Sequence, residues 1–480
     1  MADHPNETRR RGVLGWLAAH PKTTVALVGF VLLIATIVLV DRVARSHLRA
    51  QLDAIRAAGQ PTTIDDLNAR IPQISSEENI GVALVVTVQR MLTVDIPKEK
   101  SGTLPFVGRA KLPPTGRRLP PQQMESARWY LDAISNDLAD LHAALELERG
   151  CLAVRWRTPA MDVAMPELSN VRQAARGLAL EARVAAEDGD RARTLHALEA
   201  MFRLDVPLRC NTSINGGLVR VVCSALTQLQ IERTVNLGVH DDASLLRLQS
   251  LLGEYGVDLK EAMMTERVVF IDTMQWLQTR PTSRASQIVS IGGGGALSPD
   301  GWYGLIPMLP VVDMSRGIAV YSDYIDGLDR PDAAALRAAR KGDRSAQDLP
   351  AYCVLSRMVM PSLSRSIELW LRATGSKRAL QAGLACERYR LANGRWPEQL
   401  DDLVPDYLDA VPRDPFDDEP IRYARIEGGI RVWCIGEDLT DDGGDVKRLV
   451  PQSAANKPKD LGWVILNPDL RGRPAETKDD

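Results

Sequence analysis

The chain has 480 residues, of which 45% are hydrophobic and 25% charged, and its formal net charge is −3. This length predicts two or three folded units, and the composition is too apolar for a disordered chain. The near-neutral charge excludes a chain-wide basic field of the kind that binds nucleic acid. The six cysteines include no CxxC pair, which excludes a zinc ribbon.

The first informative segment is Thr23–Val40, which contains no charged residue. As a helix it would be roughly 27 Å long, close to the ~30 Å hydrocarbon core of a bilayer. A cleavable signal peptide would have a shorter apolar region and would end in a small-x-small site, whereas this run ends in Asp41-Arg42. We therefore predict one retained transmembrane helix, with the lipid bilayer as its partner.

The orientation of this anchor is not decided by charge. Four basic residues precede the span and four follow it closely, so the positive-inside rule is balanced. These residues are Arg9, Arg10, Arg11 and Lys22 before it, and Arg42, Arg45, Arg49 and Arg56 after it. The short leading segment 1–22, with its arginine triplet, favours a cytoplasmic tail and an extracytoplasmic bulk.

Residues 41–121 are expected to form a polar helical stalk and a proline-rich linker. Thr63, followed by Asp65 and Asp66, is a candidate helix N-cap. The stretch LPPTGRRLPP within residues 97–121 is typical of an extended connection.

Residues 122–278 show helical periodicity and are predicted to form an antiparallel helical bundle. Apolar residues recur at spacings of four and three, as in Ala127, Leu131, Ile134, Leu138, Leu141 and Leu145. The turn at 187–190 predicts an αα-hairpin. A Gly/Ser loop is expected at 279–304; it lacks the Lys-Ser or Lys-Thr of a phosphate-binding loop. A further helical segment is expected at 305–360.

Residues 361–466 are predicted to form an α+β module. A helix running to about Leu391 should end at Asn393-Gly394, because Gly394 can adopt the left-handed cap. Period-two alternation at 421–426 and 430–435 predicts a β-hairpin across Glu427-Gly428-Gly429, and 461–466 could add a strand. The tail 467–480 is polar and expected to be flexible. The fold class is thus mainly α, with a C-terminal α+β module and a single N-terminal transmembrane helix.

This C-terminal module resembles the globular part of the major pseudopilin of type II secretion systems. The resemblance covers about residues 379–445. It is carried by a YR..NG turn, a P.DPF…P..Y segment and a GxD loop. The matching residues are Tyr389, Arg390, Asn393, Gly394, Trp396, Pro397, Pro412, Asp414, Pro415, Phe416, Pro420, Tyr423, Gly436 and Asp438. The overall layout is similar to that of uncharacterised membrane-anchored bacterial envelope proteins, which implies a single-pass protein of the bacterial inner (cytoplasmic) membrane.

One property of pseudopilins does not carry over. Their membrane helix directly precedes the globular fold, whereas the corresponding helix here contains Arg365, Glu368, Arg372, Lys377 and Arg378 and cannot span lipid. Polymerisation into a pilus is therefore not implied.

The C-terminal module is strongly acidic, with fifteen acidic residues and four arginines between Pro397 and Val446. Nucleic acid would be repelled there. In the pseudopilin family the matching loop binds Ca²⁺, and oxygen ligands suit that ion. The candidate ligands are Asp438, Asp441, Asp442 and Asp445. The alternative is a solvated Asp-Gly turn, and both readings remain open.

No catalytic motif is recognisable. The sequence has no HExxH or GxSxG, and His142 and His196 are expected to be helix-surface or groove residues. Cys210, Cys223 and Cys386 are expected to be small core residues. We therefore expect a non-enzymatic structural or protein-interaction module that contacts an unidentified envelope protein. The alternatives are a membrane-tethered hydrolase of an envelope polymer and an accessory component of a secretion apparatus.

Overall fold

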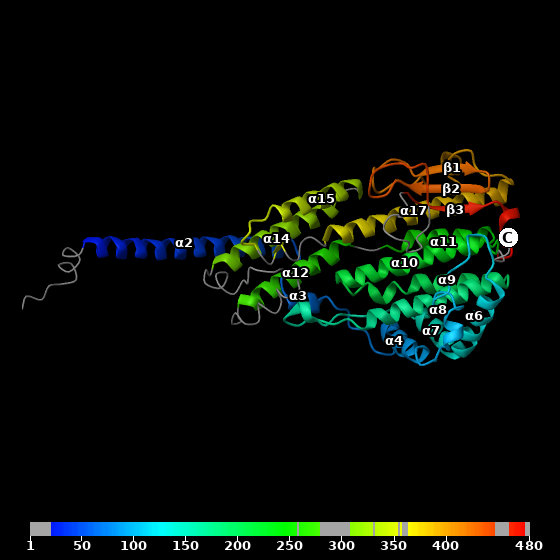
Figure 1. Cartoon of the computed structure of the whole chain (residues 1–480), viewed down its shortest axis with the longest axis horizontal. Helices are drawn as coiled ribbons and strands as arrows, with labels where there is room; N and C mark the ends of the chain where they lie inside the picture. Colours follow the sequence, from blue (N-terminus) through cyan, green and yellow to red (C-terminus); the bar gives the residue numbers. More distant parts are fainter. Residues whose placement is uncertain are drawn as a thin grey trace, which may run out of the picture.

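The structure is a computed structural model of the chain. It describes residues 21–256, 259–278, 308–329, 332–353, 356–357, 363–446 and 460–475. One long helix projects from an elongated body built mainly of helices, and a small sheet covers one side of that body (Figure 1). The mainly helical fold and the single N-terminal apolar helix expected from the sequence are confirmed.

Helix α2 (Pro21–Ala57) has two halves with opposite surroundings. In the first half apolar side chains are exposed, for example Val25 at 72% and Phe30 at 59%. This half is long and apolar enough to cross a membrane. In the second half Leu48 and Leu52 are buried against the body. The predicted stalk is therefore the continuation of the apolar helix, and it lies against the body.

The second half of α2 packs along α14 (Met308–Leu328). The Ser315 hydroxyl donates to Gln51 Oε1 at 2.6 Å, and His47 Nδ1 lies 3.2 Å from the same hydroxyl oxygen. Beyond α2, Thr63 caps α3 (Ile64–Ala69) in a capping box with Asp66, as predicted. The short helices α4 (Ile80–Met91) and α5 (Lys98–Ser101) follow.

The proline-rich segment 97–121 is fixed to the helical body along its length. Leu104 and Leu119 are buried. Two buried arginines hold its main chain: Arg233 donates to the carbonyl of Pro113, and Arg183 donates to the carbonyl of Arg117 at 2.6 Å. The segment therefore acts as a packed strap over the bundle.

The helical bundle follows the strap, and its antiparallel hairpin at 187–190 is confirmed. Gly189 has φ 76° at the turn, and Asp190 caps the second helix by accepting from Arg193 N. The helices of the bundle are α6 (Pro121–Ala133), α7 (Ser135–Glu146), α8 (Glu167–Glu187), α9 (Arg191–Arg203), α10 (Ile214–Val235), α11 (Asp242–Glu254) and α12 (Leu259–Gln278).

The predicted Gly/Ser loop 279–304 lies outside the described residues. The helical segment expected at 305–360 contains α14 and α15 (Asp332–Gln347).

The C-terminal module contains the predicted helix, hairpin and third strand. Helix α17 (Leu363–Asn393) ends at Gly394, which has φ 72°. Strands β1 (Arg422–Ile426), β2 (Gly429–Cys434) and β3 (Leu461–Leu466) form an antiparallel sheet in the order β1-β2-β3, with Tyr423 opposite Val432. The sheet packs on α17, and its edge strand β3 also contacts α10 (Figure 1).

The sheet module and the bundle share one apolar core. A single cluster of buried side chains extends from Leu48 on α2 to Ile465 on β3. The parts distinguished along the sequence are therefore packed into one body.

Two expectations are corrected by this packing. Cys210 is bonded to Cys151 in a disulfide, while Cys223 and Cys386 are buried free thiols as expected. The two bonded cysteines are 59 residues apart, so sequence spacing gave no sign of their pairing. The start of the tail is also ordered, because Arg471 pairs with the buried Glu387 at 2.6 Å; residues 476–480 lie outside the described residues.

Candidate functional site

The four aspartates proposed as calcium ligands lie on the loop that follows β2. Asp438 accepts from Thr440 N at 3.1 Å and so stabilises a local turn. Asp441 accepts from Gly443 N and from the Trp433 indole, both at 3.0 Å. Asp438, Asp441 and Asp445 are exposed, and Asp442 is half-buried. These side chains mainly hold the loop in shape.

A fifth aspartate fastens this loop from the start of the last strand. Asp460 is 1% exposed, and its Oδ2 accepts from Gly444 N at 2.7 Å and from Asp442 N at 3.1 Å. Burial raises the pKa of Asp460, and the neighbouring charges of Asp441 and Asp442 act in the same direction. Asp460 was not among the predicted ligands, because it lies outside the loop's own stretch of sequence.

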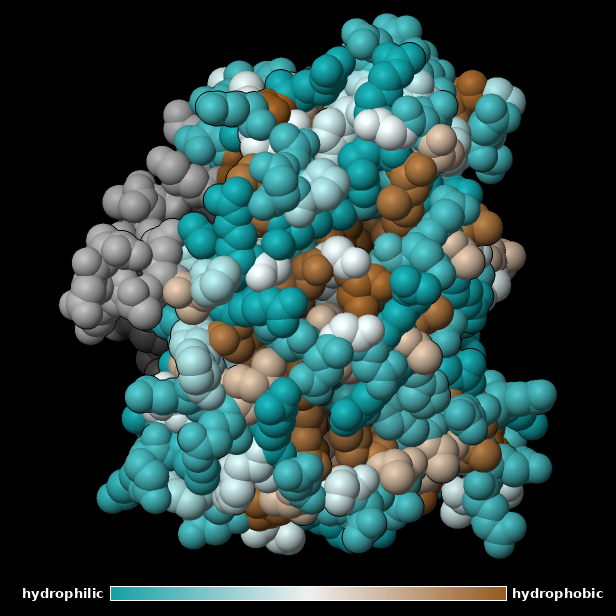
Figure 2. Space-filling model, turned by 90° about the vertical axis from the view of Figure 1, so that its right-hand side faces the viewer, coloured by the Kyte–Doolittle hydropathy of each residue, from teal (hydrophilic) through white to brown (hydrophobic). Residues whose placement is uncertain are grey.

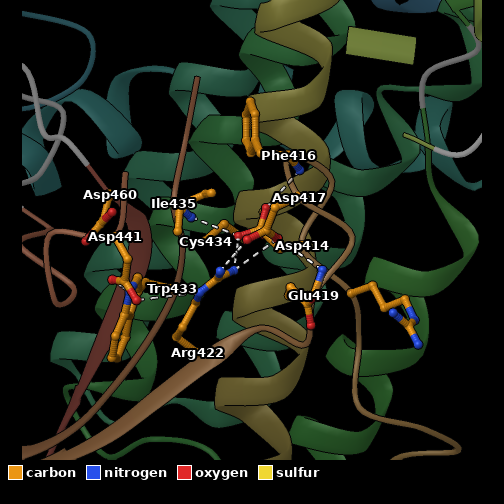
Figure 3. A network of polar contacts seen from close by, with 12 residues as sticks. Asp414, Phe416, Asp417, Glu419, Arg422, Trp433, Cys434, Ile435, Asp441 and Asp460 are labelled. Carbon is orange, nitrogen blue, oxygen red and sulfur yellow. Dashed lines mark hydrogen bonds and ion pairs between the residues drawn. The ribbon is translucent and has the colours of Figure 1, made fainter. Parts of the chain in front are cut away.

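Arg422 on β1 pairs with acidic residues around the other side of the loop. Its guanidinium donates to Asp414 Oδ2 at 2.6 Å, pairs with Asp417, and lies 3.7 Å from Asp441 Oδ2. Figure 3 shows the carboxylates of Asp414 and Asp417 converging on this guanidinium, with Asp441 beside Trp433. The positive charge within this acidic region is thus supplied by the chain itself.

The buried member of this network is Asp414, which is fully shielded from solvent. It also accepts from Phe416 N at 2.9 Å and from Ile435 N at 2.8 Å, so it joins the 414–417 turn to the end of β2. Burial raises the pKa of Asp414. Burial alone would also raise the pKa of Asp417, but its hydrogen bond with Arg422 lowers it.

This arrangement does not provide a preformed cation site. Among the residues that the structure describes, no group of three or more His, Cys, Asp or Glu side chains is placed to hold a metal ion. The oxygens of Asp438 and Asp441 are engaged by main-chain and indole N–H groups, and Arg422 takes the position of a countercharge. Asp460 Oδ1, in contrast, is buried without a hydrogen-bond partner among the described residues, and calcium binding stays a prediction.

Other residues of the pseudopilin-like motif also have structural partners. Trp396 Nε1 donates to Asn467 Oδ1 at 2.8 Å, and the Tyr423 hydroxyl donates to the carbonyl of Pro397 at 2.7 Å. Arg390 pairs with Glu387 at 2.8 Å. The motif therefore specifies how the helix, turn and sheet fit together. The similarity to pseudopilins itself stays a prediction.

A second candidate site, which the sequence did not reveal, is a cleft of about 670 Å³ between the α6–α7 pair and the α8–α9 pair. The imidazoles of His142 and His196 stack there with ring centroids 4.3 Å apart. Their placement in a groove agrees with the sequence analysis, but their contact does not follow from it, because α7 and α9 are separated in sequence by all of α8.

The ionic groups of this cleft largely satisfy one another. Glu181 is buried and accepts from His142 Nε2 at 2.6 Å and from Arg193 Nε at 3.0 Å. Burial alone would raise the pKa of Glu181, but the hydrogen bonds and charges of His142 and Arg193 lower it. Arg128 pairs with Asp188 at 2.6 Å. His142 Nδ1 is buried, whereas the His196 side chain is exposed at the cleft.

Comparisons with protein-family models, with curated proteins and with solved structures find no match for this chain.

Proposed function

We propose that this protein is a single-pass protein of the bacterial cytoplasmic membrane whose body lies outside the cytoplasm. The body would act as a non-enzymatic module that binds another envelope protein. The observation that carries the proposal is the contrast within α2. Its first half exposes an uninterrupted apolar surface, and its second half is built into the core. Exposing that much apolar surface to water is unfavourable, so a lipid environment accounts for the first half.

The disulfide supports the orientation of the body. Disulfides persist in oxidising compartments and are rare in the cytosol. Cys151 follows α7, and Cys210 follows the short helix at 206–208, so their bond ties two loops of the folded body. An extracytoplasmic body accounts for this bond.

The buried carboxylates of the two candidate sites are held in structural contacts, which favours a binding role. A general acid or base needs a titratable group that can reach a substrate. Glu181 is held by His142 and Arg193, and Asp414 by Arg422 and two main-chain N–H groups. These carboxylates are therefore used to position other parts of the protein.

Two measurements test the proposal on the full chain. Alkaline carbonate should leave the protein in the membrane pellet. In denatured membranes treated with a maleimide polymer, four cysteines should be labelled without reductant and six with it, since Cys223, Cys353, Cys386 and Cys434 are free thiols. Release by carbonate, or six labelled cysteines without reductant, would contradict the proposal.

Arginine substitutions at two places distinguish insertion of α2 into the membrane from a general effect of losing exposed apolar surface. Leu32 is 62% exposed and Leu33 57% exposed on the first half of α2, and each substitution by arginine costs about 3 kcal/mol at the centre of a span. Leu32→Arg/Leu33→Arg should abolish membrane association. Leu246→Arg on α11, at a side chain 49% exposed, should not.

A further inference from the structure

The body lies close to the end of the apolar part of α2. Leu48, the first residue of α2 buried in the body, follows Val40 by about 12 Å along the helix. The headgroup layer on each side of a bilayer is only about 5–8 Å thick. If α2 spans the membrane, the adjoining end of the body therefore lies at the lipid surface.

The position of α14 makes it part of this membrane-facing end. Ser315 lies beside His47 and Gln51. Further along both helices, Arg267 donates hydrogen bonds to the side chains of Ser322 on α14 and Gln60 beyond α2. Helix α14 therefore runs in the same direction as α2. Its first residue, Met308, precedes Ser315 by roughly 10 Å, which places it level with the end of the apolar span.

Four exposed arginines lie at this end of the body, and we call them the basic collar: Arg42, Arg49, Arg316 and Arg357. Arg42 and Arg49 lie on α2, and Arg316 follows the Ser315 contact on α14. Arg357 is held at the same level, because its neighbour Ser356 donates to Asp313 Oδ1 at 2.5 Å. Segments far apart in the sequence thus bring their positive charges to one end of the fold.

The collar has a clear excess of positive charge. Within the described residues, none of its four arginines forms an ion pair. The neighbouring acids are already engaged: Asp41 pairs with Arg45 at 2.8 Å, and Asp313 is buried against Ser356. Arginines near a lipid surface attract anionic headgroups, and this attraction weakens within about one Debye length of 8–10 Å.

We propose that the basic collar binds the headgroups of anionic phospholipids and so seats the body on the membrane. This inference rests on the proposed membrane anchoring and adds a partner to it. Figure 2 shows the opposite end of the body, where hydrophilic side chains predominate and apolar ones gather in the middle and lower part.

The test uses the full chain in lipid nanodiscs made either of phosphatidylcholine or of phosphatidylcholine with phosphatidylglycerol. The thermal midpoint should be at least about 2 °C higher with phosphatidylglycerol in low salt, and about 0.5 M NaCl should remove the difference. Arg316→Gln/Arg357→Gln should reduce this lipid-dependent shift by about half, since it removes two of the four charges. Arg316→Lys/Arg357→Lys should retain it.

Arg109→Gln/Lys111→Gln is the matched control. It removes two exposed positive charges from the strap near α6, at the end away from α2. The control should show the full lipid-dependent shift. Because the readout is a difference between two lipids, a general loss of stability cancels. Equal midpoints in both lipids, or a shift that Arg316→Gln/Arg357→Gln leaves intact, would overturn the proposal. A chain that does not enter nanodiscs would instead contradict the membrane anchoring.

Discussion

The side chain of Asn236, at the end of α10, hydrogen-bonds the main chain of Leu466 on the edge strand β3. Asn236 Oδ1 accepts from Leu466 N at 2.8 Å, and its Nδ2 donates to the carbonyl of Val464 at 2.9 Å. The amide thus pairs with the strand edge as a neighbouring strand would. It joins the helical bundle to the C-terminal sheet.

Asn236→Ala should lower the free energy of unfolding by about 3 kcal/mol. Asn236 is fully buried, and its loss leaves main-chain groups of β3 without partners. Urea denaturation of the purified protein measures the change. Asn393→Ala, at an exposed residue whose amide bonds only its own helix, should stay within about 0.5 kcal/mol of the parent. Equal effects of the two substitutions would contradict the role given to Asn236.

Arg422→Met should lower the free energy of unfolding by about 3–5 kcal/mol, because it leaves the buried carboxylate of Asp414 without its cation. Arg425→Gln is the control on the same strand. Its pair with Glu398 is exposed on both sides, so the change should be small. If the unfolding curves of the two variants coincide, Arg422 does not compensate the buried negative charge of Asp414.

Calcium should shift the thermal midpoint of the full chain by less than about 1 °C, since Asp438 and Asp441 already accept hydrogen bonds within the loop and Arg422 lies near Asp441. Thermal unfolding, followed by tryptophan fluorescence at a series of calcium concentrations, measures this shift. A saturable rise that Asp441→Asn removes would instead establish the calcium site predicted from the pseudopilin resemblance.

Acidification should destabilise the protein partly through His240. Burial lowers the pKa of His240 to about 4, from an ordinary value of 6.5, while Asp241, Glu387 and Arg191 shift it less. Between these pH values the unfolded chain binds a proton that the folded chain does not, so stability falls as pH decreases from about 6.5 to about 4. The full shift corresponds to about 3 kcal/mol.

The variant His240→Gln isolates this contribution. It should flatten the dependence of the unfolding free energy on pH over that window, measured by urea denaturation at several pH values. A parent and a variant with the same slope would show that another group accounts for the acid sensitivity.

Features encoded within one short stretch of sequence were predictable. The cap at Gly394, the β-hairpin and the N-cap at Thr63 depend on neighbouring residues, and each is confirmed. The mainly helical middle follows from periodic apolar spacing in the same way.

Features that depend on contacts between distant segments were not predictable. The disulfide of Cys151 with Cys210, the stacking of His142 on His196 and the capping of the acidic loop by Asp460 each require the packing of separate elements. The proline-rich strap was mistaken for a linker for the same reason. Its composition specifies an extended backbone, but not the buried arginines of α8 and α10 that hold it.

The most direct test of the account is protease accessibility in intact spheroplasts that express the full chain. With the body outside the cytoplasm, added protease should digest it while a cytoplasmic marker protein stays intact. A body that resists digestion until the membrane is lysed, and is then cleaved, would place it in the cytoplasm and contradict the central claim.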